Sequence, residues 1–248
     1  VAWQWKANGG TTSTNSDGNG NDVTIQVNST AGFSIMKWTG DGSNTSTVGH
    51  GLGVKPNMII FKMLEDTQNW SVAFPYFETS KLMALNTDSA FFSASGLSGY
   101  GSSTFVDGNG SSSEDFIAYC FKNIQGYSKI GSYTGNANAD GPFIYTGFKP
   151  AWVMTKNTDN SFGSNNMWII YDNKRLGINP IRHGLFPDAT DAESANDFVY
   201  IDFLSNTEFR GSSSTIKIKP KQSEEGIIIV PDGAVELYHN SELRLQTW

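Results

Sequence analysis

The sequence is poor in cysteine, in charge and in long apolar runs. Cys120 is the single cysteine among 248 residues, which excludes an intrachain disulfide and a zinc site built on several cysteines. It stands in an apolar run over 116–121, where a free thiol packs as a small buried hydrophobe. No stretch reaches the roughly 18 apolar residues of a membrane-spanning helix, and no signal peptide is recognisable. We therefore expect no membrane insertion.

Basic residues and histidines are also few. Lysine and arginine number 17 against 24 acidic residues, for a net charge of −7. No basic stripe with interleaved aromatics is present, so we expect no nucleic-acid partner. The three histidines, His50, His183 and His239, have no metal-ligand spacing to one another or to Cys120. The sequence thus predicts no metal site of this kind and no cofactor.

One polar stretch imitates part of a calcium-binding loop. Residues 17–22 place oxygen-bearing side chains at alternate positions, as the first half of such a loop does. Asp22 stands where the loop needs glycine, and Asn28 stands where it needs a closing glutamate. We interpret 17–22 as a solvated turn rich in Asn and Asp, and leave calcium binding open.

What the sequence does have is glycine, aromatics and short apolar runs. There are 26 glycines, and aromatic residues make up 13% of the chain. Aromatic and β-branched runs separated by polar, glycine-rich turns are typical of β-strands. No segment of ten or more residues has apolar positions at helical spacing, and 188–197 is the best helical candidate. We predict an all-β fold.

The chain contains an internal repeat. The segments 1–6, 32–40 and 53–62 are echoed in the same order by 117–122, 126–135 and 147–156. Gly32 and Gly126, Pro56 and Pro150, and Lys62 and Lys156 are each 94 positions apart (126 − 32, 150 − 56, 156 − 62). A further echo, 69–72 with 167–170, has slipped to 98 (167 − 69) because the intervening loop is longer. A fixed long period indicates repeated structural units. We predict two related β-sandwich-like units, at 24–122 and 123–214.

Both ends of the sequence differ from these units. Residues 1–6 resemble 117–122, so we interpret 1–23 as the last strand of a preceding unit plus a linker, and expect the chain to be a piece of a longer repetitive protein. From 215 to 248 short alternating segments are separated by turn residues. These strands either stack on neighbouring copies of the chain or complete the second sandwich.

The residues also carry a family resemblance. Residues 233–243 resemble the repeat of tail and capsid fibres in marine and freshwater phages, and 32–62 and 127–156 resemble repeated units of phage structural proteins. The longest and most specific motif is 141–152. The second unit lacks the closing strand that such units have. The resemblance implies a virion fibre protein with a host-attachment role, located in the tail or the capsid, with other virion proteins and a host cell-surface glycan as partners.

The resemblance also implies a homotrimer. Segment 215–248 has apolar residues that could bury one another around a threefold axis. They are Ile216, Ile218, Ile228, Val230, Val235, Leu237, Leu243 and Leu245.

A catalytic role is the competing hypothesis. A secreted carbohydrate-binding module or polysaccharide hydrolase would use aromatic platforms or a pair of carboxylates. The acidic candidates are Glu114, Asp115, Asp172 and Glu208, but their spacing places no two of them across a substrate, and no nucleophile motif is present. We therefore expect no enzymatic activity.

Aromatic residues supply the candidate ligand contacts. Trp38, Trp70, Trp152 and Trp168 fall in predicted strands, where core packing is expected. Tyr100 and Phe162 fall in polar loops and are expected to be exposed, as ring platforms for sugars are. These two residues are the predicted carbohydrate contacts.

Overall fold

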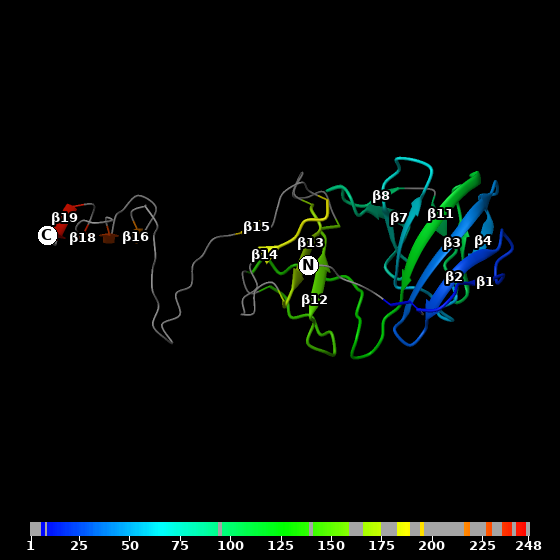
Figure 1. Cartoon of the computed structure of the whole chain (residues 1–248), viewed down its shortest axis with the longest axis horizontal. Coiled ribbons are helices and arrows are strands. Elements are labelled where there is room, and N and C mark those ends of the chain that lie inside the picture. Colours follow the sequence, from blue (N-terminus) through cyan, green and yellow to red (C-terminus); the bar gives the residue numbers. More distant parts are fainter. Residues whose placement is uncertain are drawn as a thin grey trace. The chain divides into compact units, whose positions relative to one another are not determined.

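The fold is all-β in the part of the chain that the computed structural model describes (Figure 1). That part comprises residues 6–7, 9–93, 96–138, 141–158, 166–174 and 183–188, with the strands at 194–195, 216–218, 227–229, 235–239 and 242–246. The prediction of an all-β chain is confirmed. The helical candidate 188–197 is wrong where it can be checked, because Ser194–Ala195 forms strand β15.

The first repeat is built on one large antiparallel sheet. Its eight strands lie in the order β1-β2-β3-β11-β5-β6-β7-β8. The longest of them, β11, stands at the centre and pairs with β3 on one side and β5 on the other. The bounds are β1 Ser13–Asn15, β2 Val23–Asn28, β3 Phe33–Asp41, β5 Met58–Met63, β6 Ser71–Phe74, β7 Glu78–Ala84, β8 Phe92–Ser93 and β11 Ser112–Phe121.

A smaller sheet covers one face of the large one. It contains β4 (Ser46–Gly49), β10 (Thr104–Asp107) and β9 (Leu97–Ser98). Side chains from both sheets form the first core, with Phe105 of β10 and Phe116 of β11 almost fully buried. The two layers therefore form a sandwich, because each sheet buries one face against the other.

Trp38 and Cys120 are two of the buried residues that fill this core. Trp38 stacks on Phe116, with ring centroids 5.1 Å apart, and its Nε1 donates to the carboxylate of Asp107 at 2.8 Å. Cys120 is a free, buried thiol, as the sequence predicts. Burial raises the pKa of Cys120 to about 12.

The second repeat reproduces a hairpin of the first, strand for strand. β12 (Trp152–Thr155) begins 94 positions after β5 (152 − 58) and pairs antiparallel with β13 (Ile169–Asp172). Ile60 is paired with Val72 in the first hairpin, and Met154 with Ile170 in the second. The offsets are 94 for the first strand (154 − 60) and 98 for the second (170 − 72), the values found in the sequence.

The equivalence extends to a third strand and to a lysine contact. Val72 is paired with Met83 of β7, and Ile170 forms a bridge with Leu185 just after β14 (His183–Gly184). Lys62 Nζ donates to the carbonyl of Gln68, and Lys156 Nζ donates to that of Asn166. Asn166 follows Gln68 by the same offset of 98 (166 − 68). The two repeats therefore share a three-stranded meander and the lysine that holds its first loop.

One predicted strand of the second repeat is wrong. The segment 126–135 echoes the one that forms β3, but its described residues form no strand beyond an isolated bridge between Ile124 and Ser128. The physical reason is that β3 is held between β2 and β11, and no counterpart of β11 is among the residues described. A strand needs a partner for its backbone groups.

The two repeats are joined through a second core. Trp168 packs with Met58, Val72, Phe74 and Met83 of the first repeat, on the face of the large sheet opposite the sandwich core. Its Nε1 donates to the carbonyl of Ala84 at 2.7 Å. Trp168 and Trp70 directly precede their strands instead of lying in them, which corrects the prediction for these two residues, whereas Trp38 and Trp152 are strand residues.

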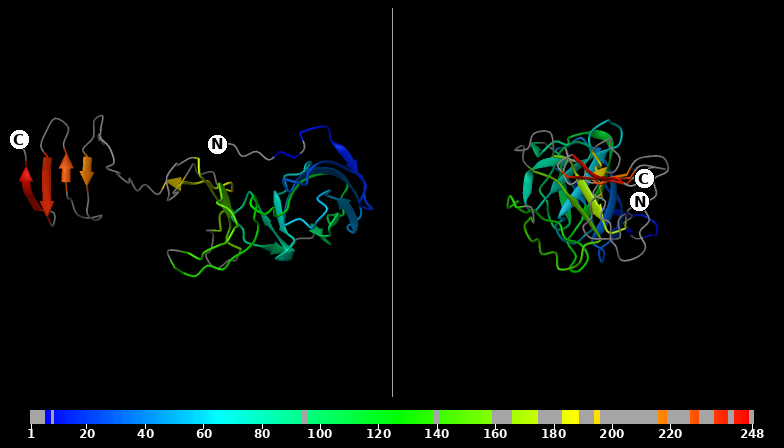
Figure 2. Two further views of the ribbon diagram at one scale, coloured as in Figure 1. Left: turned by 90° about the horizontal axis from the view of Figure 1, so that it is seen from below. Right: turned by 90° about the vertical axis from the view of Figure 1, so that its left-hand side faces the viewer.

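The C-terminal part, Asp197–Trp248, is a separate compact unit. Its described strands form a four-stranded antiparallel sheet in chain order, seen side by side in Figure 2. They are β16 Ile216–Ile218, β17 Ile227–Ile229, β18 Val235–His239 and β19 Glu242–Gln246. The alternating segments of 215–248 are thus strands, as predicted.

Candidate functional site

The two most exposed large apolar side chains of the described residues lie in one segment of the second repeat. Phe143 is 89% exposed and Tyr145 is 77% exposed, and Tyr127, Tyr133 and Ile144 in the same segment are exposed as well. We call these five residues the aromatic surface. Large aromatics on polar loops offer binding area to a partner, because their removal from water on binding is favourable.

The first repeat shows why these side chains are exposed. The 94-residue offset aligns residues 143–145 of the aromatic surface with residues 49–51, at the end of β4 and in the turn after it. The flanking Val48 and Leu52 are buried in the sandwich core. β4 is covered because it pairs with β10 and lies against the large sheet. Within the described residues the second repeat has no such pair of layers, so its aromatics point to solvent.

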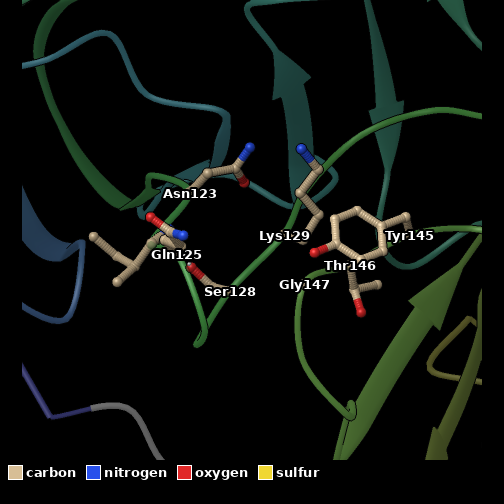
Figure 3. Close-up of a pocket in the computed structure, with 8 residues that line it drawn as sticks. Asn123, Gln125, Ser128, Lys129, Tyr145, Thr146 and Gly147 are labelled. Atoms are coloured by element: carbon tan, nitrogen blue, oxygen red, sulfur yellow. Dashed lines mark hydrogen bonds between the residues drawn. The ribbon is translucent and has the colours of Figure 1, made fainter.

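A polar hollow lies beside the aromatic surface. It encloses about 270 Å³, and Figure 3 shows Asn123, Gln125 and Ser128 on one side with Lys129 and Tyr145 on the other. Two stretches of chain build it, the turn over 123–129 and the segment 145–147. The complete lining is Asn123, Ile124, Gln125, Ser128, Lys129, Tyr145, Thr146 and Gly147.

Part of the lining holds the hollow in shape. The Asn123 side chain accepts from the amide of Ile130 at 2.6 Å and donates to the Ile130 carbonyl at 3.3 Å. Ser128 Oγ donates to the Lys122 carbonyl and accepts from the amide of Ile124. Gly147 has a φ of 82°, a conformation that favours glycine and turns the chain at the rim.

The rest of the lining is exposed and can meet a ligand. Gln125 offers an amide, Lys129 an ammonium group, and Tyr145 a ring and a hydroxyl. An aromatic face with a few polar hydrogen-bonding groups around it is the chemistry that suits a sugar ring, whose faces are apolar and whose edge is polar. The ammonium group adds attraction for an acidic sugar.

Tyr100, one of the two predicted carbohydrate contacts, does not line this hollow. Tyr100 is half-buried and packs against the first core, and its hydroxyl donates to the Leu97 carbonyl at 2.8 Å. Burial raises the pKa of Tyr100 to about 12. The prediction that Tyr100 is exposed is therefore wrong, because an aromatic ring in a glycine-rich loop folds back onto the core when it can. Phe162 lies outside the described residues.

The acidic candidates are placed as structural groups where they can be seen. Asp115 lies 2.6 Å from the Lys37 ammonium and accepts from Thr39 Oγ1, and these contacts hold its pKa below the usual range. A carboxyl that stays ionised is unsuited to general-acid catalysis. Glu114 neighbours it on β11, Asp172 is buried on β13, and Glu208 lies outside the described residues.

The loop 17–22 is an exposed turn that is held to β4 by hydrogen bonds. Asn19 Oδ1 accepts from the amide and the hydroxyl of Thr47, at 2.7 and 2.8 Å. The Gly20 amide donates to the Thr47 carbonyl. The side chains of Asp17, Asn19, Asn21 and Asp22 are exposed, which agrees with the interpretation of a solvated turn. No cluster of three or more His, Cys, Asp or Glu that could hold a metal ion occurs among the residues described.

The sequence did not lead us to predict a binding site at the aromatic surface, because we used residues 141–152 only as the motif that carries the family resemblance. The signal was present in the sequence: Pro142, Phe143, Ile144 and Tyr145 stand between two glycines, Gly141 and Gly147. Such apolar residues between turn-forming positions, aligned with residues 48–51 (Val-Gly-His-Gly) in the first repeat, indicate a surface that differs between the repeats.

Comparisons with known proteins give a family but no activity. The described residues contain no helix that is long and apolar enough to cross a membrane. No curated protein and no solved structure matches this chain. A family described as a domain of unknown function matches residues 1–219, which include both repeats and leave out three of the four strands of the C-terminal sheet. The chain belongs to this family, DUF7483.

Proposed function

We propose that the chain is a component of a bacteriophage virion fibre that contacts a host cell-surface glycan through the aromatic surface. The observation that carries the binding role is the exposure of Phe143 and of Tyr145, whose ring also lines the polar hollow. The Tyr145 ring, the Gln125 amide and the Lys129 ammonium group line that hollow together. We assign binding to this surface rather than catalysis, because the visible carboxylates such as Asp115 are engaged in structural contacts.

The fibre role is supported by repetition and by resemblance. Two β-units with one shared meander, followed by a separate small sheet, suit an elongated protein built from successive modules. Residues 127–156 and 233–243 resemble repeats of phage structural proteins. The place of action is then the virion, in its tail or capsid, among other virion proteins.

The C-terminal sheet supports assembly as a homotrimer. Antiparallel partners occupy the same face of a sheet, and the register aligns Ile218, Ile227, Leu237 and Leu245 across its four strands. A sheet with one apolar face needs a second layer to cover it. Equivalent sheets of two further copies provide that layer around a threefold axis, which also closes the assembly.

Electron microscopy of virions tests the fibre role. Purified phage particles from the source are labelled with gold-conjugated antibody raised against this chain. We expect gold on fibres of the tail or the capsid, which also decides between the two locations. Particles without label, together with the chain free in the medium, would favour a secreted carbohydrate-binding module.

Two substitutions and a matched control test the binding role. Tyr145→Ala and Phe143→Ala each remove an exposed ring, and Tyr76→Ala removes an exposed ring from the first repeat as the control. Binding of the intact chain to an array of bacterial surface polysaccharides is measured. We expect the first two variants to lose tenfold or more in affinity, since burying an apolar ring on binding contributes about 1.5–3 kcal/mol, and Tyr76→Ala to bind normally. Equal binding by all variants would refute the assignment.

A further inference from the structure

Lys156 and Asp188 bring an amine and a carboxyl group together in a buried part of the second repeat. Lys156 Nζ lies 3.6 Å from Asp188 Oδ2, and the two side chains are 1% and 0% exposed. This distance is longer than the roughly 2.7–2.9 Å of a hydrogen-bonded ion pair. It is close to the roughly 3–3.5 Å at which enzymes hold two atoms that are about to react. The two groups are therefore placed for a reaction with each other.

The other contacts of Lys156 prepare its nitrogen as a nucleophile. Nζ donates to the Thr87 carbonyl at 2.9 Å and to the Asn166 carbonyl. A neutral amine has two hydrogens and one lone pair, so these two bonds use both hydrogens and leave the lone pair for Asp188. Burial lowers the pKa of Lys156, which favours the neutral amine, the form that attacks a carboxyl carbon.

The backbone of Trp168 holds the carboxyl group. The Trp168 amide donates to both oxygens of Asp188, at 3.2 Å to Oδ1 and 3.0 Å to Oδ2. When an amine adds to a carboxyl carbon, negative charge develops on these oxygens, and a donor already aimed at them stabilises that charge. The buried Trp168 ring lies 5.3 Å from Lys156 Nζ and covers the amine. The site therefore contains a nucleophile, an electrophile and a donor for the developing charge.

The first repeat has the same frame with an exposed amide in place of the buried carboxyl. Asn86 Oδ1 accepts from the Trp70 amide at 2.9 Å, as Asp188 accepts from the amide of Trp168. The offset of 102 between these acceptors (188 − 86) is also the offset between the third strands of the two meanders (185 − 83). Asn86 is exposed, and Lys62 donates to carbonyls of an exposed loop. A buried carboxyl beside the lysine is thus specific to the second repeat.

We propose that Lys156 and Asp188 condense to an amide, which is an isopeptide crosslink within the second repeat. A proton passes from the ammonium group to the carboxylate and leaves a neutral amine beside a carboxylic acid. Nζ then bonds to Cγ of Asp188, the bond from Cγ to the hydroxyl oxygen breaks, and this hydroxyl leaves as water with one hydrogen of the amine. The reaction needs no oxidant and no second reactant. Fixed proximity favours it, because groups held in this way react as if at about 10⁵–10⁸ M.

The crosslink would stabilise the second repeat in the way that a disulfide does. It joins the residue that follows β12 to the turn after β14 and closes a loop in the chain between them. A covalent bond that closes a loop restricts the unfolded chain, which favours the folded one. Cys120 is the single cysteine, so an intrachain disulfide cannot provide this restriction. The crosslink does not depend on whether the chain binds glycan.

The mass of the intact chain tests the proposal. Folded protein is incubated until its mass is constant and is then denatured for mass spectrometry. We expect a mass that is lower than that of the sequence by one water molecule. Digestion with trypsin should give a branched peptide that contains both Lys156 and Asp188, with no cleavage after Lys156. The full mass of the sequence, with separate peptides for the two residues, would overturn the proposal.

Two arginine substitutions provide matched controls. Lys156→Arg keeps the positive charge but removes the amine, so this variant should have the full mass of its sequence. Lys62→Arg makes the same change in the first repeat and should still lose one water molecule. A loss of water that persists in Lys156→Arg would come from another site, such as an aspartate that cyclises, and would overturn the proposal. If Lys156→Arg does not fold, the branched peptide of the unsubstituted chain decides, because it identifies the two joined residues directly.

Discussion

Lys156 Nζ lies 3.6 Å from Asp188 Oδ2, and both side chains are almost completely buried, at 1% and 0% exposure. The ammonium group also donates to the carbonyls of Thr87 and Asn166, and it lies over the ring of Trp168. Asp188 in turn accepts from the amide of Trp168. The ion pair lies within the second repeat, and the hydrogen bond from Lys156 to the Thr87 carbonyl ties the β12–β13 hairpin to the turn after β7 and so joins the two repeats.

We predict that Lys156→Met destabilises the protein strongly. Removing one partner of a buried ion pair leaves the other charge uncompensated, which costs about 3–5 kcal/mol. The free energy of unfolding from urea denaturation measures the effect. Burial already lowers the pKa of Lys156 against the opposing attraction of Asp188, which shows that the ammonium group depends on its partner.

Lys62→Met is the matched control, because Lys62 is the counterpart of Lys156 in the first repeat. Its ammonium group donates to the carbonyls of Asp66 and Gln68 in an exposed loop and has no buried carboxylate to leave behind. We expect a loss of about 1 kcal/mol or less. Similar losses in the two variants would contradict the role given to the buried pair.

The sequence predicts the repeated meander well and the environment of the lysines poorly. The 94-residue spacing of Pro56 and Pro150 locates β5 and β12 because each strand follows a turn with a local signature. Nothing local distinguishes Lys62 from Lys156. The partner Asp188 lies 32 positions beyond Lys156 (188 − 156), and its burial depends on packing between the repeats.

The candidate site shows the same limit. Tyr100 and Tyr145 both stand near glycines and polar residues, yet one folds onto the core and the other points to solvent. The difference depends on the layers around each loop, which come from strands distant in sequence. The segment 126–135 has the pattern of β3, but a pattern specifies a strand only where a partner strand is in reach.

His50 should make the protein less stable as the pH is lowered below about 6.5. Its ring is fully buried, and burial lowers its pKa from the 6.5 of the unfolded chain. The Leu52 amide donates to Nδ1, so the neutral ring carries its proton on Nε2, facing the Gly101 carbonyl. Below pH 6.5 the unfolded chain therefore binds a proton that the folded chain excludes, and the free energy of unfolding falls as the pH is lowered.

Urea denaturation at several pH values checks this prediction. His50→Gln should remove this part of the pH dependence, with a lower stability at every pH because the substitution disturbs the core. A change that begins near pH 6.5 lies above the range where carboxyls with lowered pKa, such as Asp115, become protonated. A His50→Gln variant with the original slope would exclude His50 as the cause.

Gly18→Ala should undock the loop 17–22 from β4. A Cβ at Gly18 would lie 2.0 Å from the backbone oxygen of Thr47, and a backbone atom cannot move aside cheaply. The loop must shift, which breaks the bonds between Asn19 and Thr47. We expect a loss of about 1–3 kcal/mol and faster amide exchange in 17–22 and at Thr47. At Gly10 nothing lies within 4 Å of an added Cβ, so Gly10→Ala should leave both quantities unchanged; equal effects at the two glycines would show that the contact is not the cause.

The proposed homotrimer leads to a prediction that separates the two faces of the C-terminal sheet. Leu237 is in register with Ile227 and Leu245, whereas Ile228 is in register with Lys217 and Glu236 and occupies the opposite face. If the apolar face is buried between copies, Leu237→Asp should dissociate the trimer, because several apolar side chains contribute about 1.5–3 kcal/mol each to association. Ile228→Asp places the same charge on the neighbouring strand and should leave the trimer intact.

Sedimentation velocity at micromolar concentration measures these outcomes. Truncation after Gly211 removes the whole sheet and retains both repeats in the compact unit Val1–Asn196, so it should give a folded monomer. The free energy that holds the copies together would then reside in the four short strands, which are marginally stable without a covering layer. An intact chain that sediments as a monomer, or a trimer that survives the truncation, would contradict assembly through this sheet. Dissociation by Ile228→Asp as readily as by Leu237→Asp would show that the sheet is needed but that the apolar face is not the interface.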